Sequence, residues 1–197
     1  MAVKPLAVHD LAEDVLACVC VALDQAAVDV PDQPGCPECR SCLVPGQVAF
    51  DSCEDPCGPT PQTGGQLSVS IARVFPSTSF PNEDREVRGL RGCTPPTLLA
   101  VELVVTLLRC APGPTDEGCP PTCDELTAAA RILSVDLVTV YNALLCCLPD
   151  TAPTPRGRRY VIGASKTIGP EGGCVGLEQR VTVGLYGCYT CPGGDAS

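Results

Sequence analysis

Sixteen cysteines in a chain of 197 residues are the side chains best suited to chemistry. Two pairs have the CxxC spacing, Cys36 with Cys39 and Cys188 with Cys191. Such pairs are the usual half-sites of a tetrahedral zinc centre, because the spacing lets both sulfurs reach one ion. The spacing therefore predicts a structural zinc site formed by these four cysteines.

Other states of these sulfurs remain open. Cys42, Cys53 and Cys57 are competing ligands closer in sequence to the first pair. Many cysteines lie beside Pro and Gly in expected loops, where disulfides formed outside a cell or unpaired thiols also fit. A thioredoxin-type role needs its CxxC pair at a helix N-terminus after a strand, whereas Cys36 and Cys39 lie in a Pro-rich loop. Zinc, disulfides and free thiols are the alternatives, and no other cofactor is expected.

Groups for acid, base or nucleophilic catalysis are sparse. His9 is the single histidine, and no motif pairs it with a nucleophile. The glycine-rich segment 169–173 joins two expected strands and lacks the Lys-Ser/Thr ending of a phosphate loop. Glu83 and Asp84 lie side by side in a charged loop, where we expect them to be solvated. The sequence therefore predicts a protein that is not an enzyme.

Charge and hydropathy indicate the compartment and the partners. A net charge of −10 argues against a main role in gripping nucleic acid or an anionic membrane. His9, Asp10 and Glu13 occupy the place where a secretory signal would be apolar, and no apolar run is as long as a membrane span. A cytosolic origin with reduced thiols is favoured. Reduced thiols in a cytosol conflict with the many cysteines in expected loops, which are placed as disulfides or metal ligands would be. We retain both observations.

Two groups of arginines are candidates for an interface. Each group lies in an expected loop, where its charges are accessible to a protein partner. The first is interleaved with acidic residues and the second precedes a strand: Arg85, Arg88 and Arg91, then Arg156, Arg158 and Arg159.

The first half of the chain predicts one helix and two strands. Apolar residues at helical spacing indicate an amphipathic helix over 7–28, with Cys18 and Cys20 as small apolar core residues. An irregular, Cys-rich loop is expected at about 29–46. Alternating residues then predict strands that pair as a long-looped antiparallel hairpin, with a bulge near the end of the second, at 47–52 and 66–75.

The second half predicts three strands and a long helix. Thr122 and Glu125 form a capping box at the start of a helix that runs to Pro149. Its core stripe is expected to begin at Leu126. The strands, which are rich in β-branched residues, are expected at 97–110, 159–168 and 175–186.

These elements predict an α+β fold. We expect an antiparallel β-sheet of four to five strands, with the N-terminal helix and the long helix packed on one face. The chain is expected to form a single domain over 1–197, in which 29–46 is a Cys-rich loop insertion and 188–197 a flexible tail.

Several segments, taken in order, resemble a known family. They are VPGQVAFDSC, GQLSVSIARVFPSTSFP, LLRCAP at 107–112, the helix ending ALLCCL, and GPEGGCVGLEQRVTVGL. Together they resemble the neck proteins of long-tailed actinobacterial phages, in particular the tail terminators, over residues 44–186. The Cys-rich loop 35–57 is longer and richer in cysteine than is general in that family.

The resemblance implies a structural virion protein. A tail terminator is a small α/β subunit that forms a ring, usually sixfold, which caps the tail tube beneath the head-closure protein. It implies a homo-oligomer, here a hexameric ring, with the tail tube protein and a head-closure or adaptor protein as partners. The protein would be assembled in the host cytoplasm and would be located in the neck of the virion. We expect the ring to have an acidic lumen, through which genomic DNA passes without specific binding. We expect the loop 76–96 and the arginines at 156–159 to contact neighbouring subunits or the tube.

Alternative functions are also compatible with the sequence. A head-closure or adaptor ring protein of the same neck is the nearest one. A zinc-stabilised protein-binding module would follow if the two CxxC pairs meet at one ion. A thiol oxidoreductase would require a cysteine with a lowered pKa.

Overall fold

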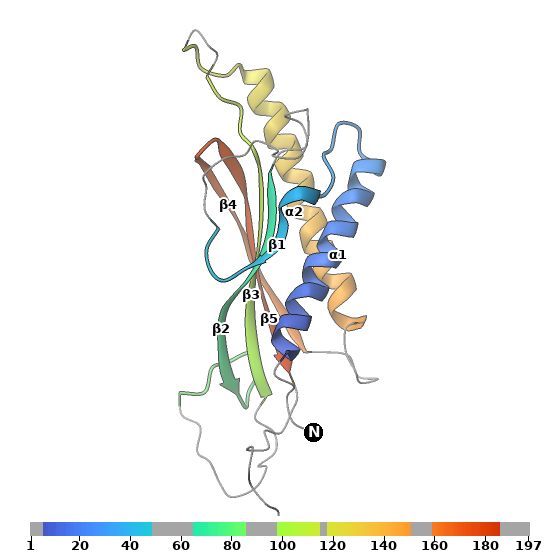
Figure 1. The fold of residues 1–197 in the computed structure, drawn as a ribbon, viewed down its shortest axis with the longest axis vertical. Coiled ribbons are helices and arrows are strands. Elements are labelled where there is room, and N and C mark those ends of the chain that lie inside the picture. The colour runs from blue at the N-terminus through green and yellow to red at the C-terminus, as the bar shows by residue number, and fades with distance from the viewer. Residues whose placement is uncertain (1–5, 49–64, 86–97, 115–117, 151–158, 186–197) are drawn as a thin grey trace, which may run out of the picture.

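A computed structural model describes residues 6–48, 65–85, 98–114, 118–150 and 159–185 of the chain. Two helices and a five-stranded sheet form an α+β fold, as predicted (Figure 1). In chain order the elements are α1 (Ala7–Asp29), the 3-10 turn η1 (Glu38–Arg40), β1 (Ser41–Val44), β2 (Gln66–Ser77), β3 (Leu98–Cys110), α2 (Cys123–Asp150), β4 (Tyr160–Glu171) and β5 (Cys174–Leu185).

The sheet is mixed rather than purely antiparallel. Its strand order is β1-β2-β3-β5-β4, and every pairing is antiparallel except that of β1 with β2, which is parallel. The parallel strand lies inside the segment 29–46, which we expected to be an irregular loop. Leu43 and Val44 supply the apolar residues for it. The connection that a parallel pairing needs runs from β1 to β2 through 45–65, and its part 49–64 lies outside the described residues.

We expected a strand at 47–52 to pair with the strand at 66–75. That prediction is wrong, because the strand that pairs with β2 on this side is β1. Gln47 and Val48 follow β1 without belonging to a strand, and 49–52 lie outside the described residues. The predicted bulge in β2 is confirmed, because the register with β3 shifts between Ile71 and Arg73. The predicted turn at 169–173 is also confirmed. It turns at Gly172 and Gly173, which both have positive φ.

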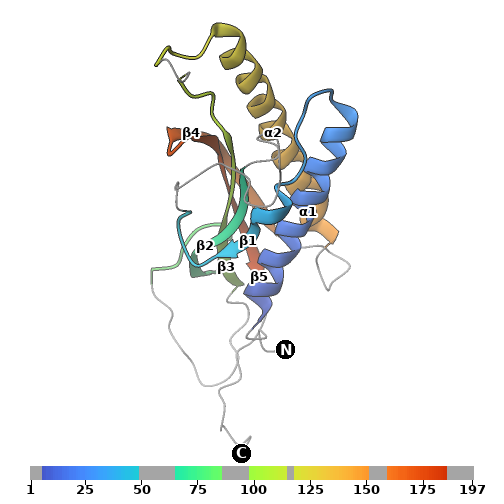
Figure 2. The same ribbon diagram turned by 45° about the horizontal axis from the view of Figure 1, so that its top comes forward.

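Both helices pack on the same face of the sheet, as predicted (Figures 1 and 2). α1 buries Leu11, Val15, Val19 and Leu23 against β2 and β3, each no more than 1% exposed. These residues recur every four positions, so they form one stripe of the helix.

The long helix α2 begins with the predicted capping box. The Thr122 backbone N–H donates to Glu125 Oε2 at 2.8 Å, and the Glu125 N–H donates to Thr122 Oγ1 at 3.3 Å. The core stripe starts later than predicted, because Leu126 is 50% exposed and the N-terminal turns extend beyond α1 (Figure 1). Val140 and Leu144 are buried further along.

One property of α2 departs from the sequence expectation. The segment Cys123–Leu148 is 26 residues long and, with a mean hydropathy of 1.6 in its most apolar window, could cross a membrane by length and composition. Only 28% of that window is buried in the protein. Much of its apolar surface therefore faces outward.

Candidate functional site

Two disulfides join α1 to other parts of the molecule. Cys18 is bonded to Cys147 near the end of α2, and Cys20 is bonded to Cys36 in the segment before η1. We expected Cys18 and Cys20 to be small apolar core residues, and both are partly buried against the core. The expectation did not include their disulfides. On a helix, residues 18 and 20 point in directions about 200° apart, so each can reach a different partner. Cys39 and Cys174 are disulfide-bonded as well.

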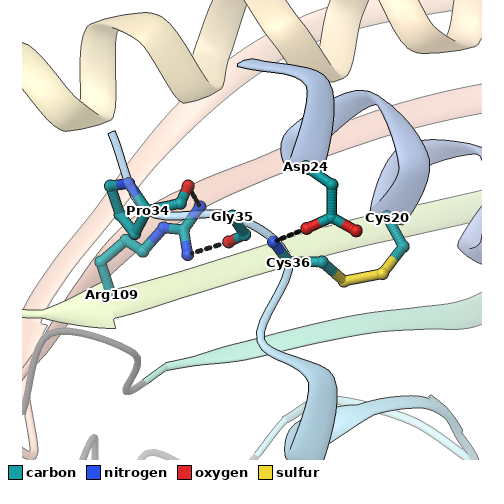
Figure 3. Close-up of a disulfide and its surroundings, with 6 residues drawn as sticks. All are labelled: Cys20, Asp24, Pro34, Gly35, Cys36 and Arg109. Atoms are coloured by element: carbon teal, nitrogen blue, oxygen red, sulfur yellow. Dashed lines mark hydrogen bonds between the residues drawn. A yellow bond between two sulfur atoms is a disulfide. The ribbon is translucent and has the colours of Figure 1, made fainter. Parts of the chain in front are cut away.

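A buried ion pair fixes the segment between α1 and η1. Arg109 at the end of β3 binds Asp136 of α2 through two hydrogen bonds, from Nε to Oδ2 at 2.9 Å and from Nη2 to Oδ1 at 3.0 Å. The same guanidinium donates to the Gly35 carbonyl at 2.7 Å and the Pro34 carbonyl at 3.1 Å (Figure 3). Gln33 Nε2 adds a hydrogen bond of 2.8 Å to Asp136. We call these five residues the Arg109 node.

Burial makes the Arg109 node a strong constraint. The side chain of Asp136 is fully buried and that of Arg109 is 7% exposed. An unpaired charge there would be costly, so the bidentate geometry holds the three elements in one arrangement. Asp24 of α1 supports the same segment by accepting a 2.8 Å hydrogen bond from the Cys36 N–H (Figure 3). The Cys20–Cys36 disulfide lies directly beside this contact.

The predicted zinc site stays a prediction. Cys36 is paired with Cys20 and so offers no thiolate in this state. Cys39 is also disulfide-bonded. Cys188 and Cys191 lie outside the described residues, so the four sulfurs cannot be compared. At the start of α1, His9, Asp10 and Glu13 place ligand atoms within 4.8 Å of one another, all of them exposed. Exposed acidic groups of this kind are common without a metal.

A ladder of charges crosses the sheet face opposite the helices. Glu102 of β3 is at its centre, with a side chain 9% exposed. It accepts from Arg73 Nε of β2 and, at 2.9 Å, from Arg180 Nη1 of β5. The hydrogen bond from Arg73 is the main reason why the pKa of Glu102 is below its ordinary value of 4.5, and Arg180 lowers it further. Glu83 and Glu178 extend the ladder at its two ends.

A polar cavity lies on this same face. Its volume is about 330 Å³, and it opens between β4 and the segment after β1. The lining combines both signs of charge with hydroxyl groups and little apolar surface. Its residues are Gln47, Val48, Thr106, Lys166, Thr167, Ile168, Gly169, Glu171 and Glu178.

The first half of the edge strand β4 and one face of α2 lie next to each other and carry no exposed charge. β4 has β5 on one side and, within the described part of the chain, no strand on the other. On α2, the single charged side chain between residues 132 and 148 is Asp136, which is buried. The two regions adjoin where the Tyr160 hydroxyl donates to the Leu145 carbonyl at 3.5 Å. We call this the α2–β4 surface. Its exposed apolar residues on α2 are Val138 (60%), Tyr141 (43%) and Leu145 (40%). On β4 it includes Val161 (42%), which pairs with Thr182 and so points to the sheet face opposite the helices.

The predicted arginine groups are only partly described. Arg85 and Arg159 are both exposed, at the ends of described segments. Arg88, Arg91, Arg156 and Arg158 lie outside the described residues. The interface role of these arginines therefore stays a prediction.

Sequence reasoning missed the Arg109 node, although two signals for it were present. Arg109 is a charge after the apolar residues Leu107 and Leu108 at the end of a strand, and Asp136 is a charge within an apolar part of a helix. A charge in such a place usually has a partner of opposite sign. Comparison with known proteins identifies no relative, because no family model matches the chain and no curated protein matches it significantly.

Proposed function

We propose that the protein is a structural subunit of a phage neck, a tail terminator whose copies join in a ring that caps the tail tube. The proposal combines the resemblance over residues 44–186 with one structural observation, the α2–β4 surface. A tail terminator acts by assembly and needs no catalytic group. The virion is its place, and the tail tube and the head-closure complex are its partners.

The open edge of β4 supports self-assembly. The strand is 12 residues long, and the half from Tyr160 to Ser165 contains neither a charge nor a proline. Natural sheet edges are protected by such residues, as they are in the other half of β4 by Lys166 and Pro170. An unprotected stretch with free backbone groups can pair with a strand of a neighbouring copy.

The uncharged face of α2 adds apolar area beside that edge. In a chain of net charge −10, a helical segment of 17 residues without an exposed charge is unusual. A neighbouring copy that covers Val138, Tyr141 and Leu145 would remove that apolar surface from water. If the neighbour uses a different patch for this contact, the contact runs head to tail and can close into a ring.

The acidic surface of the subunit fits a channel for DNA. The exposed carboxylates of α1 are Asp10, Glu13, Asp14, Asp24 and Asp29, and the helix contains no lysine or arginine. We propose that acidic residues face the lumen, where repulsion of phosphates would let DNA pass without binding. A ring lined by lysine and arginine would contradict this part of the proposal.

Oligomeric state measured with and without tail tubes tests the proposal. We expect sedimentation velocity and electron microscopy of the wild-type protein to show rings, alone or at the ends of added tail tubes. The double variant Val138→Glu/Val161→Lys should stay monomeric and leave the tubes uncapped. Val21→Glu is the matched control, since Val21 is a valine on α1 that is 70% exposed. It should assemble like the wild type.

Other outcomes point to other functions. Rings that bind a head-closure partner but no tail tubes would favour the adaptor alternative. A monomer with stoichiometric zinc would favour the protein-binding module. A protein that binds phosphatidylcholine vesicles through α2 and stays monomeric with tail tubes would overturn the proposal, as would rings that persist in the double variant.

The arginine groups define a second, separate test. We propose that the loop 76–96 and the segment 156–159 add polar contacts between subunits or with the tube. Charge reversal at Arg85, Arg88 and Arg91 should then leave the monomer folded and abolish rings. Ring formation unaffected by that reversal would contradict this contact while leaving the α2–β4 surface intact.

A further inference from the structure

The two disulfides divide the described chain into two connected parts. Residues 6–48, with α1, η1 and β1, form what we call the N-terminal unit, and residues 65–185 form the body. Cys20–Cys36 closes a short loop inside the N-terminal unit, over a sequence separation of 16. Cys18–Cys147 joins that unit to the end of α2 in the body, over a separation of 129. The Cα–Cα distances of 5.0 and 6.4 Å lie in the range of natural disulfides.

The N-terminal unit has a complete set of contacts without its sulfur bridges. Leu11, Val19 and Leu23 are fully buried against the body, and β1 pairs with β2 over four residues. The Arg109 node links the segment 33–35 to β3 and α2 through hydrogen bonds and an ion pair, which are independent of the redox state. The chain can therefore reach this fold while its cysteines are reduced.

The same contacts hold the thiols in position to react. Arg109 binds the carbonyls of Pro34 and Gly35, and Asp24 binds the next N–H, so Cys36 is kept beside Cys20 (Figure 3). On the other side of α1, Cys18 Sγ lies 3.7 Å from the Ala143 carbonyl oxygen. A reduced Cys18 thus has a hydrogen-bond acceptor that faces it from the same helix as Cys147.

We propose that these four cysteines form an oxidative latch, which is open while the protein folds in a reducing compartment and closes when it meets an oxidant. Each pair of thiols loses two protons and two electrons to form one disulfide. A disulfide oxidant such as oxidised glutathione accepts them and is released as two thiols, after exchange through a mixed disulfide. Closure of Cys18–Cys147 fastens the N-terminal unit to the body.

The latch reconciles two features of the chain. Thiols stay reduced in a cytosol and pair in oxidising surroundings. A protein made in a cytosol would fold with an N-terminal unit that is docked on the body and can still detach. Once the protein is exposed to oxidising surroundings, the disulfide would prevent that detachment. This inference concerns the fold itself and does not depend on the proposed ring.

Hydrogen exchange on the full-length protein tests the latch. Amide exchange in α1 is measured by mass spectrometry after equilibration with either oxidised glutathione or a phosphine reductant. We expect exchange in α1 to be slower by on the order of 100-fold in the oxidised protein, because a bridge across 129 residues strongly restricts the opened state. Exchange in β3 and β5 should change much less.

Two cysteine variants make the test specific. Cys147→Ala should lose most of the difference in α1 exchange between the two conditions, apart from the effects of Cys20–Cys36 and of the disulfide at Cys39. Cys146→Ala is the matched control, because Cys146 is an exposed, unpaired neighbour on the same helix. It should keep the full difference.

Peptide mapping provides a readout that does not need the variants to fold. Digestion of the oxidised wild type under non-reducing conditions should yield a linked peptide pair containing Cys18 and Cys147. A linkage of Cys18 to Cys146 would overturn the proposal. So would equal protection of α1 in the oxidised and reduced wild type, or a reduced wild type that fails to fold.

Discussion

The two edge strands of the sheet, β1 and β4, differ in how much of the chain contacts them. At one edge, β1 has four residues, and the segment that leads into it is fixed by the Arg109 node and the Cys20–Cys36 disulfide. At the other edge, β4 has 12 residues, most of them exposed, beside a helix face without exposed charge. The first edge is bound to its own chain by contacts that are costly to break. The second leaves its backbone groups and apolar side chains accessible to another molecule.

Under the proposed function, this difference separates residues that stabilise the fold from residues that mediate self-association. Substitutions near β1 should affect the free energy of unfolding strongly, because they expose or unpair buried polar groups. Substitutions near β4 should leave that free energy almost unchanged and act on oligomeric state. The predictions below compare the two regions in order of expected effect.

Asp136→Ala should have the largest effect on folding. It leaves the Arg109 guanidinium buried without its carboxylate, which we expect to lower the free energy of unfolding by about 3–5 kcal/mol. Urea denaturation followed by circular dichroism measures the change. Glu171→Ala, at an exposed carboxylate on β4, is the control and should change it by less than about 0.5 kcal/mol. Equal effects of the two substitutions would contradict the comparison.

Thr122→Ala should have an intermediate effect, of about 1 kcal/mol. It removes a side-chain acceptor for the Glu125 N–H at the start of α2 and a side-chain donor to the Glu125 carboxylate. Two hydrogen bonds from Thr122 to the Glu125 carboxylate hold the pKa of Glu125 below its usual value. The larger effect comes from the backbone N–H and the smaller from the hydroxyl. The variant should therefore raise the pKa of Glu125, which NMR titration can follow. An unchanged titration would show that the capping box is not formed in solution.

Glu102→Gln should have a smaller effect that depends on pH. The pKa of Glu102 is lowered in the folded protein, so ionised Glu102 contributes stability above the unfolded-state value of 4.5 and loses it as the pH falls through the lower folded value. At pH 7 we expect a cost below about 1 kcal/mol, since both arginine partners are half-exposed. The difference between wild type and variant should vanish in acid. A difference that is constant from pH 7 to pH 2 would contradict this assignment.

Val161→Lys should have the smallest effect on folding, within about 0.5 kcal/mol. The side chain lies on the open edge strand and is 42% exposed, so a charge can replace it without burial. Sedimentation should nevertheless show weaker self-association, because a lysine on an edge strand disfavours pairing with another strand. A variant that unfolds readily would show that β4 is part of the folding core instead.

The sequence predicted most elements because their patterns are local. The stripe of α1, the capping box of α2 and the bulge in β2 each depend on residues close together in the chain. The parallel strand β1 was missed because four residues in a Pro- and Cys-rich segment carry no clear period. Its pairing with β2 joins residues 26 positions apart, such as Ser41 and Leu67, which is a long-range relation.

The candidate site was harder to predict for the same reason. Arg109 and Asp136 are 27 residues apart, and Cys18 and Cys147 are 129 apart, so spacing alone could not pair them. The CxxC pattern directed attention to Cys36 and Cys39, whereas the partner of Cys36 is Cys20, on a helix. Among 16 cysteines many pairings are compatible with the sequence, and only the fold selects among them.

The bridge between Cys18 and Cys147 also has a mechanical consequence. A force that pulls on the first helix would pass through two sulfur atoms into the last turns of the long helix, and would bypass the hydrogen bonds of the parallel strand. The four residue pairs of that strand would then carry little of the load. In the proposed ring, tension between subunits that reaches the first helix would be carried by a covalent path.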